Sequence, residues 1–245
     1  MNNSLQDKLT YLAFSLTLFM SATLMFAIQP MAGKMLLPLI GGTPAGWIVA
    51  MAFFQVMLLA GYLLAHLFSG FRPLVHGALY VAALAAGLYF MPMILSQHTS
   101  KISANPGAWD IFKLLTYTMA VPFIALSATS STIQRLFTTT GHKSAADPYF
   151  LYVASNIGSF AGLLLYPAVI EPTLTLSSQS HYTGWYYGML VAAAALCLFM
   201  ARKGKEAPVS SEKTSEPVTP RQYIDWMLLA FVPSSLLSGV TIYIT

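Results

Sequence analysis

Residues Asp147 to Pro172 read DPYFLYVASNIGSFAGLLLYPAVIEP, an apolar stretch between an Asp-Pro and a Glu-Pro pair. The 23 residues from Pro148 to Ile170 carry no charge. At about 1.5 Å per residue they would cross a hydrocarbon core about 30 Å thick. Ala154, Gly158 and Gly162 follow at four-residue spacing and form one smooth stripe, on which a second helix can approach closely. The stretch therefore predicts a transmembrane helix packed inside a bundle.

The composition is typical of an integral membrane protein. Of the 245 residues, 56% are hydrophobic and 8% are charged, and the mean hydropathy is +0.65, which excludes an ordinary soluble domain. The net charge of +4 comes from basic residues scattered among apolar segments, so no nucleic acid partner is predicted. Cys197 is the only cysteine, and the histidine spacing predicts no metal site and no cofactor.

The hydropathy pattern predicts a polytopic, all-α bundle. A six-helix membrane unit occupies residues 1–202, a solvated linker rich in charge, Pro and Ser occupies 203–221, and a seventh transmembrane helix occupies 222–245. Because one helix follows the linker instead of six, we expect the chain to be a fragment of a longer protein. The six predicted spans are Leu9–Gln29, Trp47–Phe68, Pro73–Leu95, Ile111–Ile133, Pro148–Ile170 and Trp185–Met200.

The distribution of basic residues predicts the orientation of these spans. Nine of the 12 Lys and Arg residues fall in the N-terminus, in alternate loops and in the linker, and three fall on the opposite side. The positive-inside rule then places the N-terminus and the linker in the cytoplasm.

An internal repeat predicts how the helices are related. A shift of 106 residues lays Leu9–Thr23 on Leu115–Thr129, with LTY matched at one end and SAT at the other. A duplicated unit of three helices turns its second copy upside down in the membrane. The expected fold is thus a 3+3 inverted repeat, like half of a major facilitator superfamily transporter, plus a seventh helix.

The stretch Phe26–Trp47 predicts a broken helix end and a re-entry near the outer surface. Pro30 and Pro38 remove backbone donors there, and Gly33 permits a turn. Lys34 stands inside this stretch and has two open interpretations. It meets an anionic substrate or a carboxylate in a cavity, or it extends to the membrane surface with its stem against lipid.

Other polar residues lie within or near the spans and are candidates for a ligand site or a polar pathway. Buried amides in a membrane either bridge helices by hydrogen bonds or line such a pathway, and both interpretations stay open. These candidates are Gln29, Gln55, Gln134 and Asn156.

Charged residues near the span ends suggest a gate. Arg135 and Asp147 flank the same predicted cytoplasmic loop, so they could pair across it. The hydroxyl-rich run Ser127–Arg135 either walls a pathway or returns hydrogen bonds to its own helix after Pro122. Glu171 is predicted as a solvated charge at a helix end, with a proton carrier as the alternative.

Several stretches together resemble the bacterial fused MFS/spermidine synthase proteins, in which a transporter-like membrane region precedes a soluble aminopropyltransferase-like domain. The resemblance implies an integral inner-membrane protein with a polyamine-related function. The nucleotide-type and amine sites of the family's synthase part have no counterpart here, so we do not expect this chain to be an enzyme. The stretches are Gln29–Trp47, Phe53–His66, Leu126–Phe137, Asp147–Pro172 and Leu228–Thr245.

Two functional hypotheses follow. In the first, the chain is the transporter-like membrane portion of such a protein and takes part in transport or sensing of a small cationic metabolite, with its C-terminal membrane and synthase-like region missing. In the second, it is a non-catalytic membrane anchor or scaffold for a partner enzyme, without a ligand of its own.

Overall fold

The computed structural model describes residues 2–41, 44–95, 106–145, 147–203 and 219–244. Within these ranges the regular structure is helical and no strand occurs. The chain divides into two compact units, Met1–Ala207 and Pro208–Thr245. The all-α fold predicted from the hydropathy pattern is confirmed.

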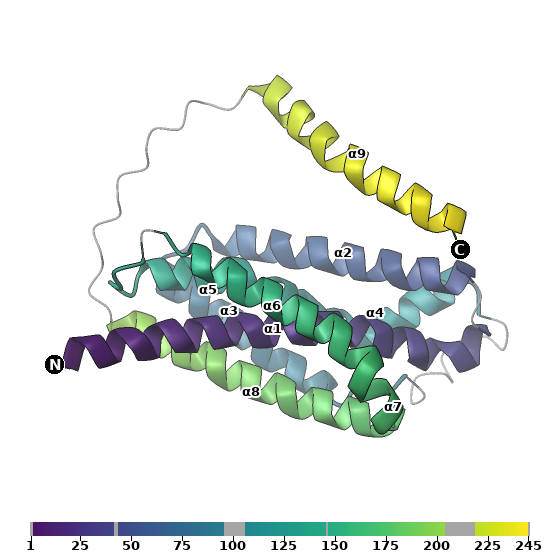
Figure 1. The fold of residues 1–245 in the computed structure, drawn as a ribbon, viewed down its shortest axis with the longest axis horizontal. Coiled ribbons are helices and arrows are strands. Elements are labelled where there is room, and N and C mark those ends of the chain that lie inside the picture. Colours follow the sequence, from purple (N-terminus) through teal and green to yellow (C-terminus); the bar gives the residue numbers. More distant parts are fainter. Residues whose placement is uncertain (1, 42–43, 96–105, 146, 204–218, 245) are drawn as a thin grey trace. The chain divides into compact units, whose positions relative to one another are not determined.

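Six membrane-length segments make up the first unit (Figure 1). Each is long and apolar enough to cross a membrane, which confirms the six predicted spans and a multi-pass protein. The helices of this unit are α1 (Asn2–Ile40), α2 (Pro44–Phe68), α3 (Pro73–Gly87), η1 (Leu88–Phe90), α4 (Ala108–Ser127), α5 (Thr129–Thr138), α6 (Tyr149–Leu165), η3 (Tyr166–Ile170), α7 (Glu171–Thr173) and α8 (Leu176–Lys203).

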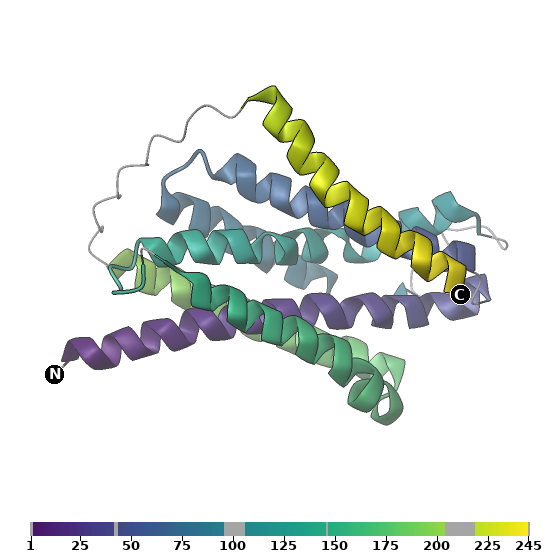
Figure 2. The same ribbon diagram turned by 45° about the horizontal axis from the view of Figure 1, so that its top comes forward.

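The most extensive contact between two helices of the described unit joins α1 and α6, which are inclined to each other in both ribbon views (Figures 1 and 2). A methyl group on Gly158 would collide with the carbonyl oxygen of Phe19, and one on Gly162 would collide with that of Thr23. The Thr23 hydroxyl also donates to the Gly158 carbonyl oxygen, at 3.0 Å. The predicted stripe therefore packs inside the unit, with Ala154 half-buried at its edge.

The helix pair α2 and α4 repeats this arrangement. Gly61 of α2 lies so close to α4 that an added methyl group would meet Ser127 and the carbonyl oxygen of Ile124. Thr23 and Ser127 belong to the two SAT triplets matched by the internal repeat, and each triplet receives a glycine from the other repeat's second helix. Ser21 of the first triplet donates to the carbonyl oxygen of Leu126, the residue before the second triplet, at 3.4 Å. Both contacts thus lie at or beside the matched triplets, and the inverted arrangement in a membrane stays a prediction.

The segment formed by α4 and α5 lies in the core of the unit. Leu115, Met119, Phe123, Ile133 and Phe137 are all fully buried. The hydroxyls of Ser127 and Thr132 donate to carbonyl oxygens of their own helix, at 2.8 Å each. Back-bonding, one of the two interpretations of this hydroxyl-rich run, is thus what the structure shows.

A helix break occurs within the predicted stretch Phe26–Trp47, but it does not lie at the two prolines. Helix α1 continues through Pro30 and Pro38 to Ile40. Each proline removes one backbone hydrogen bond, but buried side chains on both sides, such as Ile28 and Leu36, hold the helix in place.

The chain turns only after Ile40, where Gly41 adopts a φ of 63° that favours glycine. Gly41 donates its backbone N–H to Leu37 O at 2.9 Å, as expected at a helix C-terminus. Gly33 has a different role from the predicted turn, because it makes room for the Trp47 ring.

Two further boundaries differ from the prediction. Helix α8 begins at Leu176, nine residues before the predicted Trp185. Its first turns are polar, and two of their side chains, Gln179 and Ser180, are buried in the unit. The predicted third span to Leu95 ends its helical part at Phe90.

The second unit contains α9 (Pro220–Ile244). Its first turn is capped by Thr219, whose backbone N–H donates to Gln222 Oε1 at 2.8 Å, as in a capping box. The predicted seventh helix is confirmed as a helix, and its crossing of a membrane stays a prediction. The predicted linker falls mostly on residues 204–218, which lie outside the described residues.

We expect Gly158→Ala to destabilise the first unit by about 1–3 kcal/mol, because the added methyl group forces α6 away from α1. Gly188→Ala is the matched control, since a methyl group there meets only Leu88 Cδ2 at 3.9 Å. The control should be neutral or slightly stabilising. Thermal unfolding of the purified variants in detergent measures the difference, and equal melting temperatures would contradict the close contact.

Candidate functional site

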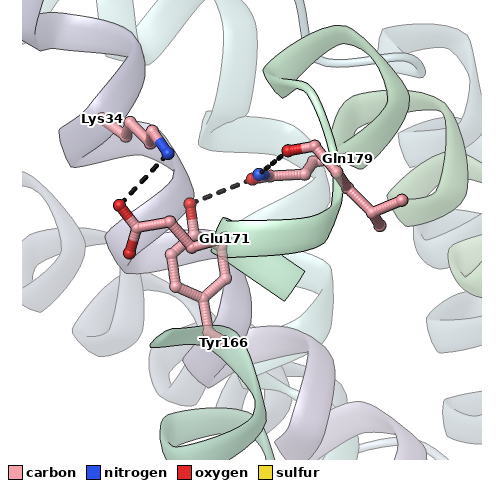
Figure 3. Close-up of polar contacts among 5 residues, drawn as sticks. Lys34, Tyr166, Glu171 and Gln179 are labelled. Atoms are coloured by element: carbon pink, nitrogen blue, oxygen red, sulfur yellow. Dashed lines mark hydrogen bonds and ion pairs between the residues drawn. The ribbon is translucent and has the colours of Figure 1, made fainter. Parts of the chain in front are cut away.

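An ion pair joins α1 to the end of the α6 segment (Figure 3). Lys34 Nζ lies 3.1 Å from Glu171 Oε1, and the two side chains are 35% and 44% exposed. Lys34 therefore pairs with a carboxylate at a partly exposed position, and its extension to the membrane surface stays a prediction. Glu171, predicted as a solvated charge at a helix end, is the partner.

A buried hydrogen-bond chain lies beside this ion pair (Figure 3). Tyr166 donates its hydroxyl to Gln179 Oε1 at 3.0 Å, and Gln179 Nε2 donates to Leu174 O at 2.9 Å. Both Tyr166 and Gln179 are almost inaccessible, with 3% and 2% exposed. These two hydrogen bonds hold the start of α8 against η3.

A cavity of about 240 Å³ adjoins the hydrogen-bond chain. It lies between α1, η3 and the first turns of α8. Three tyrosines surround it, and none of its lining residues is charged. Its lining consists of Thr23, Leu24, Ala27, Met31, Tyr166, Ile170, Leu174, Gln179, Tyr182, Thr183 and Tyr186.

A π-helical turn, η3, brings the ion pair and the cavity together. Pro167 has no backbone N–H and its ring crowds the preceding turn, so the helix widens over Tyr166–Ile170. The wider turn places Tyr166 and Ile170 in the cavity wall and Glu171 directly after them, opposite Lys34. Such π turns occur frequently at functional sites.

A second polar cluster connects α3 and α5. Arg135 Nη1 lies 2.7 Å from His76 Nδ1, and His76 Nε2 lies 3.0 Å from Thr132 Oγ1. Because arginine can only donate, Nδ1 accepts and Nε2 carries the proton, which it donates to Thr132. Nearby, the buried Tyr80 donates to Thr129 Oγ1 at 2.9 Å. This cluster holds α3 and α5 together.

The predicted gate between Arg135 and Asp147 is not formed in this structure. Arg135 instead donates to His76 and, through Nη2, to Phe71 O at 3.0 Å. Asp147 is exposed, and its carboxylate accepts a hydrogen bond from the backbone of Tyr149 at 3.3 Å. Asp147 thus forms an Asx turn just before α6, whose N-cap residue is Pro148.

The four polar amide candidates do not line the cavity. Gln134 donates to Ser130 of its own helix at 3.0 Å, and Gln29 is half-buried on α1. Gln55 and Asn156 are exposed on α2 and α6, and neither bridges two helices within the described part of the unit.

Sequence reasoning missed Tyr166, Gln179 and Tyr186 as parts of the site. Pro167 beside an aromatic residue was a signal for the widened turn. Gln179 stood outside the predicted spans, because the polar run before Trp185 resembles a loop. No signal in the sequence joins Gln179 to Tyr166.

Comparisons with known proteins add nothing to this geometry: no family model, no curated protein and no solved structure matches the chain.

We expect Tyr166→Phe to destabilise the unit by about 1–3 kcal/mol, because it leaves the buried Gln179 Oε1 without a donor. Tyr182→Phe removes a hydroxyl from the same cavity, but that side chain is 60% exposed, so a change within about 0.5 kcal/mol is expected. Thermal unfolding in detergent compares the two. Equal decreases in melting temperature for the two variants would show that the hydrogen bond from Tyr166 to Gln179 does not contribute to the stability of the unit.

Proposed function

We propose that the six-helix unit binds a small organic cation at the end of the tyrosine-lined cavity, with Glu171 as the counter-ion. The protein would be the transporter-like membrane portion of a larger system that transports or senses that cation. In this proposal it lies in the bacterial inner membrane with its N-terminus in the cytoplasm, as the distribution of basic residues predicts.

The observation that carries the proposal is a carboxylate beside a cavity walled by aromatic rings. Glu171 follows Ile170, and both Ile170 and Tyr166 line the cavity. Tyrosine faces attract ammonium groups. The Glu171 carboxylate is 44% exposed near the end of the segment Tyr149–Thr173, where a cation from solution can reach it. The existing partner of Glu171 is itself an ammonium group, that of Lys34.

The resemblance to fused MFS/spermidine synthase proteins supports the same class of ligand. The residues of the ion pair and of the widened turn lie within two of the stretches that carry the resemblance, Gln29–Trp47 and Asp147–Pro172. A polyamine-related metabolite is therefore one candidate cation. The proposal assigns no catalytic step to this chain.

We expect Glu171→Gln to reduce binding of organic amines at least tenfold, because the ammonium group loses its counter-ion. Calorimetric titration of the full chain in lipid nanodiscs with 2-phenylethylamine and with spermidine measures this, with empty nanodiscs as the blank. Asp110→Asn is the matched control, since it removes a carboxylate whose partner Lys113 lies 3.0 Å away on α4, remote from the cavity lining.

Binding that is lost in Glu171→Gln and kept in Asp110→Asn supports the proposal. Absence of amine binding by the unaltered protein, or binding that Glu171→Gln leaves intact, would overturn it.

One observation favours the alternative, a membrane scaffold without a ligand. Gln55 and Asn156 present amides on exposed faces of α2 and α6, and in a membrane such amides pair with another helix. A scaffold of this kind loses its cellular phenotype when Gln55 and Asn156 are replaced by leucine and keeps it in Glu171→Gln. The transporter-like protein shows the reverse, because Glu171 is the counter-ion of its ligand.

A further inference from the structure

We infer that the ligand of the Glu171 site is a monoamine with an apolar body, and that polyamines bind there poorly. This inference rests on the proposed function and narrows it, because it names the kind of cation that the cavity admits.

The contact with Lys34 indicates which kind of cation the Glu171 carboxylate binds. Its Nζ is a primary ammonium 3.1 Å from Glu171 Oε1, carried on a chain of four methylene groups. At 35% exposure the Lys34 side chain can turn into water when it leaves the carboxylate. A ligand ammonium can then take the position of Nζ without leaving an unpaired carboxylate. The Lys34 ammonium group thus competes with the ligand's ammonium group for the Glu171 carboxylate.

The cavity lined by Ile170, the residue directly before Glu171, admits an apolar body. Leu24, Ala27, Met31, Ile170 and Leu174 supply aliphatic or thioether surface. At about 30 Å³ for each water molecule, the volume of about 240 Å³ equals about eight waters, which suits a group of the size of a benzene ring and its linker. The faces of the tyrosines add favourable contacts with such a ring.

The same cavity is unsuited to a second positive charge. No carboxylate lines it, and its main polar groups already have partners. Thr23 bonds to Phe19 O and Gly158 O, and Gln179 bonds to Tyr166 and Leu174 O. A second ammonium in the cavity would be desolvated without a counter-ion, a cost that exceeds the gain from hydrogen bonds alone.

The rank order of three probes tests the selectivity. Nanodiscs with the full chain are titrated with 2-phenylethylamine, with spermidine, and with 2-phenylethanol, which has the same body without the charge. We expect 2-phenylethylamine to bind at least tenfold more tightly than either of the others.

Removal of the Lys34 ammonium group provides a second test. We expect Lys34→Met to bind 2-phenylethylamine about two- to fivefold more tightly, since an exposed ion pair of this kind contributes modestly. Lys113→Met removes a lysine from a comparable ion pair at the start of α4 and should leave the affinity unchanged. Lys34→Arg keeps a cation at Glu171 and should also bind no more tightly than the unaltered protein.

The outcomes separate this inference from the proposed function. Tighter binding of spermidine that still depends on Glu171 overturns the inference and leaves the proposed function standing. Equal binding of 2-phenylethanol and 2-phenylethylamine, unaffected by Glu171→Gln, overturns both and identifies an apolar pocket suited to a lipid tail. An unchanged or weaker affinity in a folded Lys34→Met protein overturns the competition by Lys34.

Discussion

The contact on which the six-helix unit depends is the close approach of α6 to α1 at Gly158 and Gly162. Lipid offers no hydrophobic drive for helices to associate, so close packing and hydrogen bonds between helices have to supply it. Here the absence of two side chains lets α6 rest on backbone atoms of Phe19 and Thr23. The Thr23 hydroxyl then reaches the Gly158 carbonyl oxygen and fixes the register of the pair.

The site follows from this register. Once α6 is fixed along α1, the widened turn at Pro167 carries Tyr166 and Glu171 to the end of α1 that bears Lys34. The polar start of α8 then completes the wall through Gln179. A carboxylate, an ammonium group and three tyrosines meet there, although they come from segments far apart in the sequence. The cavity lies where the packing of three helices is interrupted by the π turn.

The sequence predicted the features that depend on local composition. Six spans and the glycine stripe on α6 follow from hydropathy or from spacing along one helix, and the structure has them. For the hydroxyl-rich run after Pro122 the sequence left two interpretations open, of which the structure shows back-bonding. The break predicted at Pro30 and Pro38 was wrong, because the burial of their neighbours is a property of the whole bundle and not of the local sequence.

The pairing of side chains was predicted less well for the same reason. Lys34 had several possible partners along the chain, and only the packing of α6 on α1 selects Glu171. Arg135 was predicted to pair with Asp147 across a loop, whereas in the structure it donates a hydrogen bond to His76 of α3. Tyr166 and Gln179 form a buried hydrogen bond that no spacing in the sequence indicates.

The Thr23 to Gly158 hydrogen bond has a consequence for biosynthesis. Its two residues are 135 positions apart in the chain, so at about 5–20 residues per second α1 leaves the ribosome about 7–27 s before its partner exists. During that interval the surface of α1 that will receive the glycines faces lipid, another helix or the insertion machinery. The mature bundle therefore forms late in synthesis, after α6 enters the membrane.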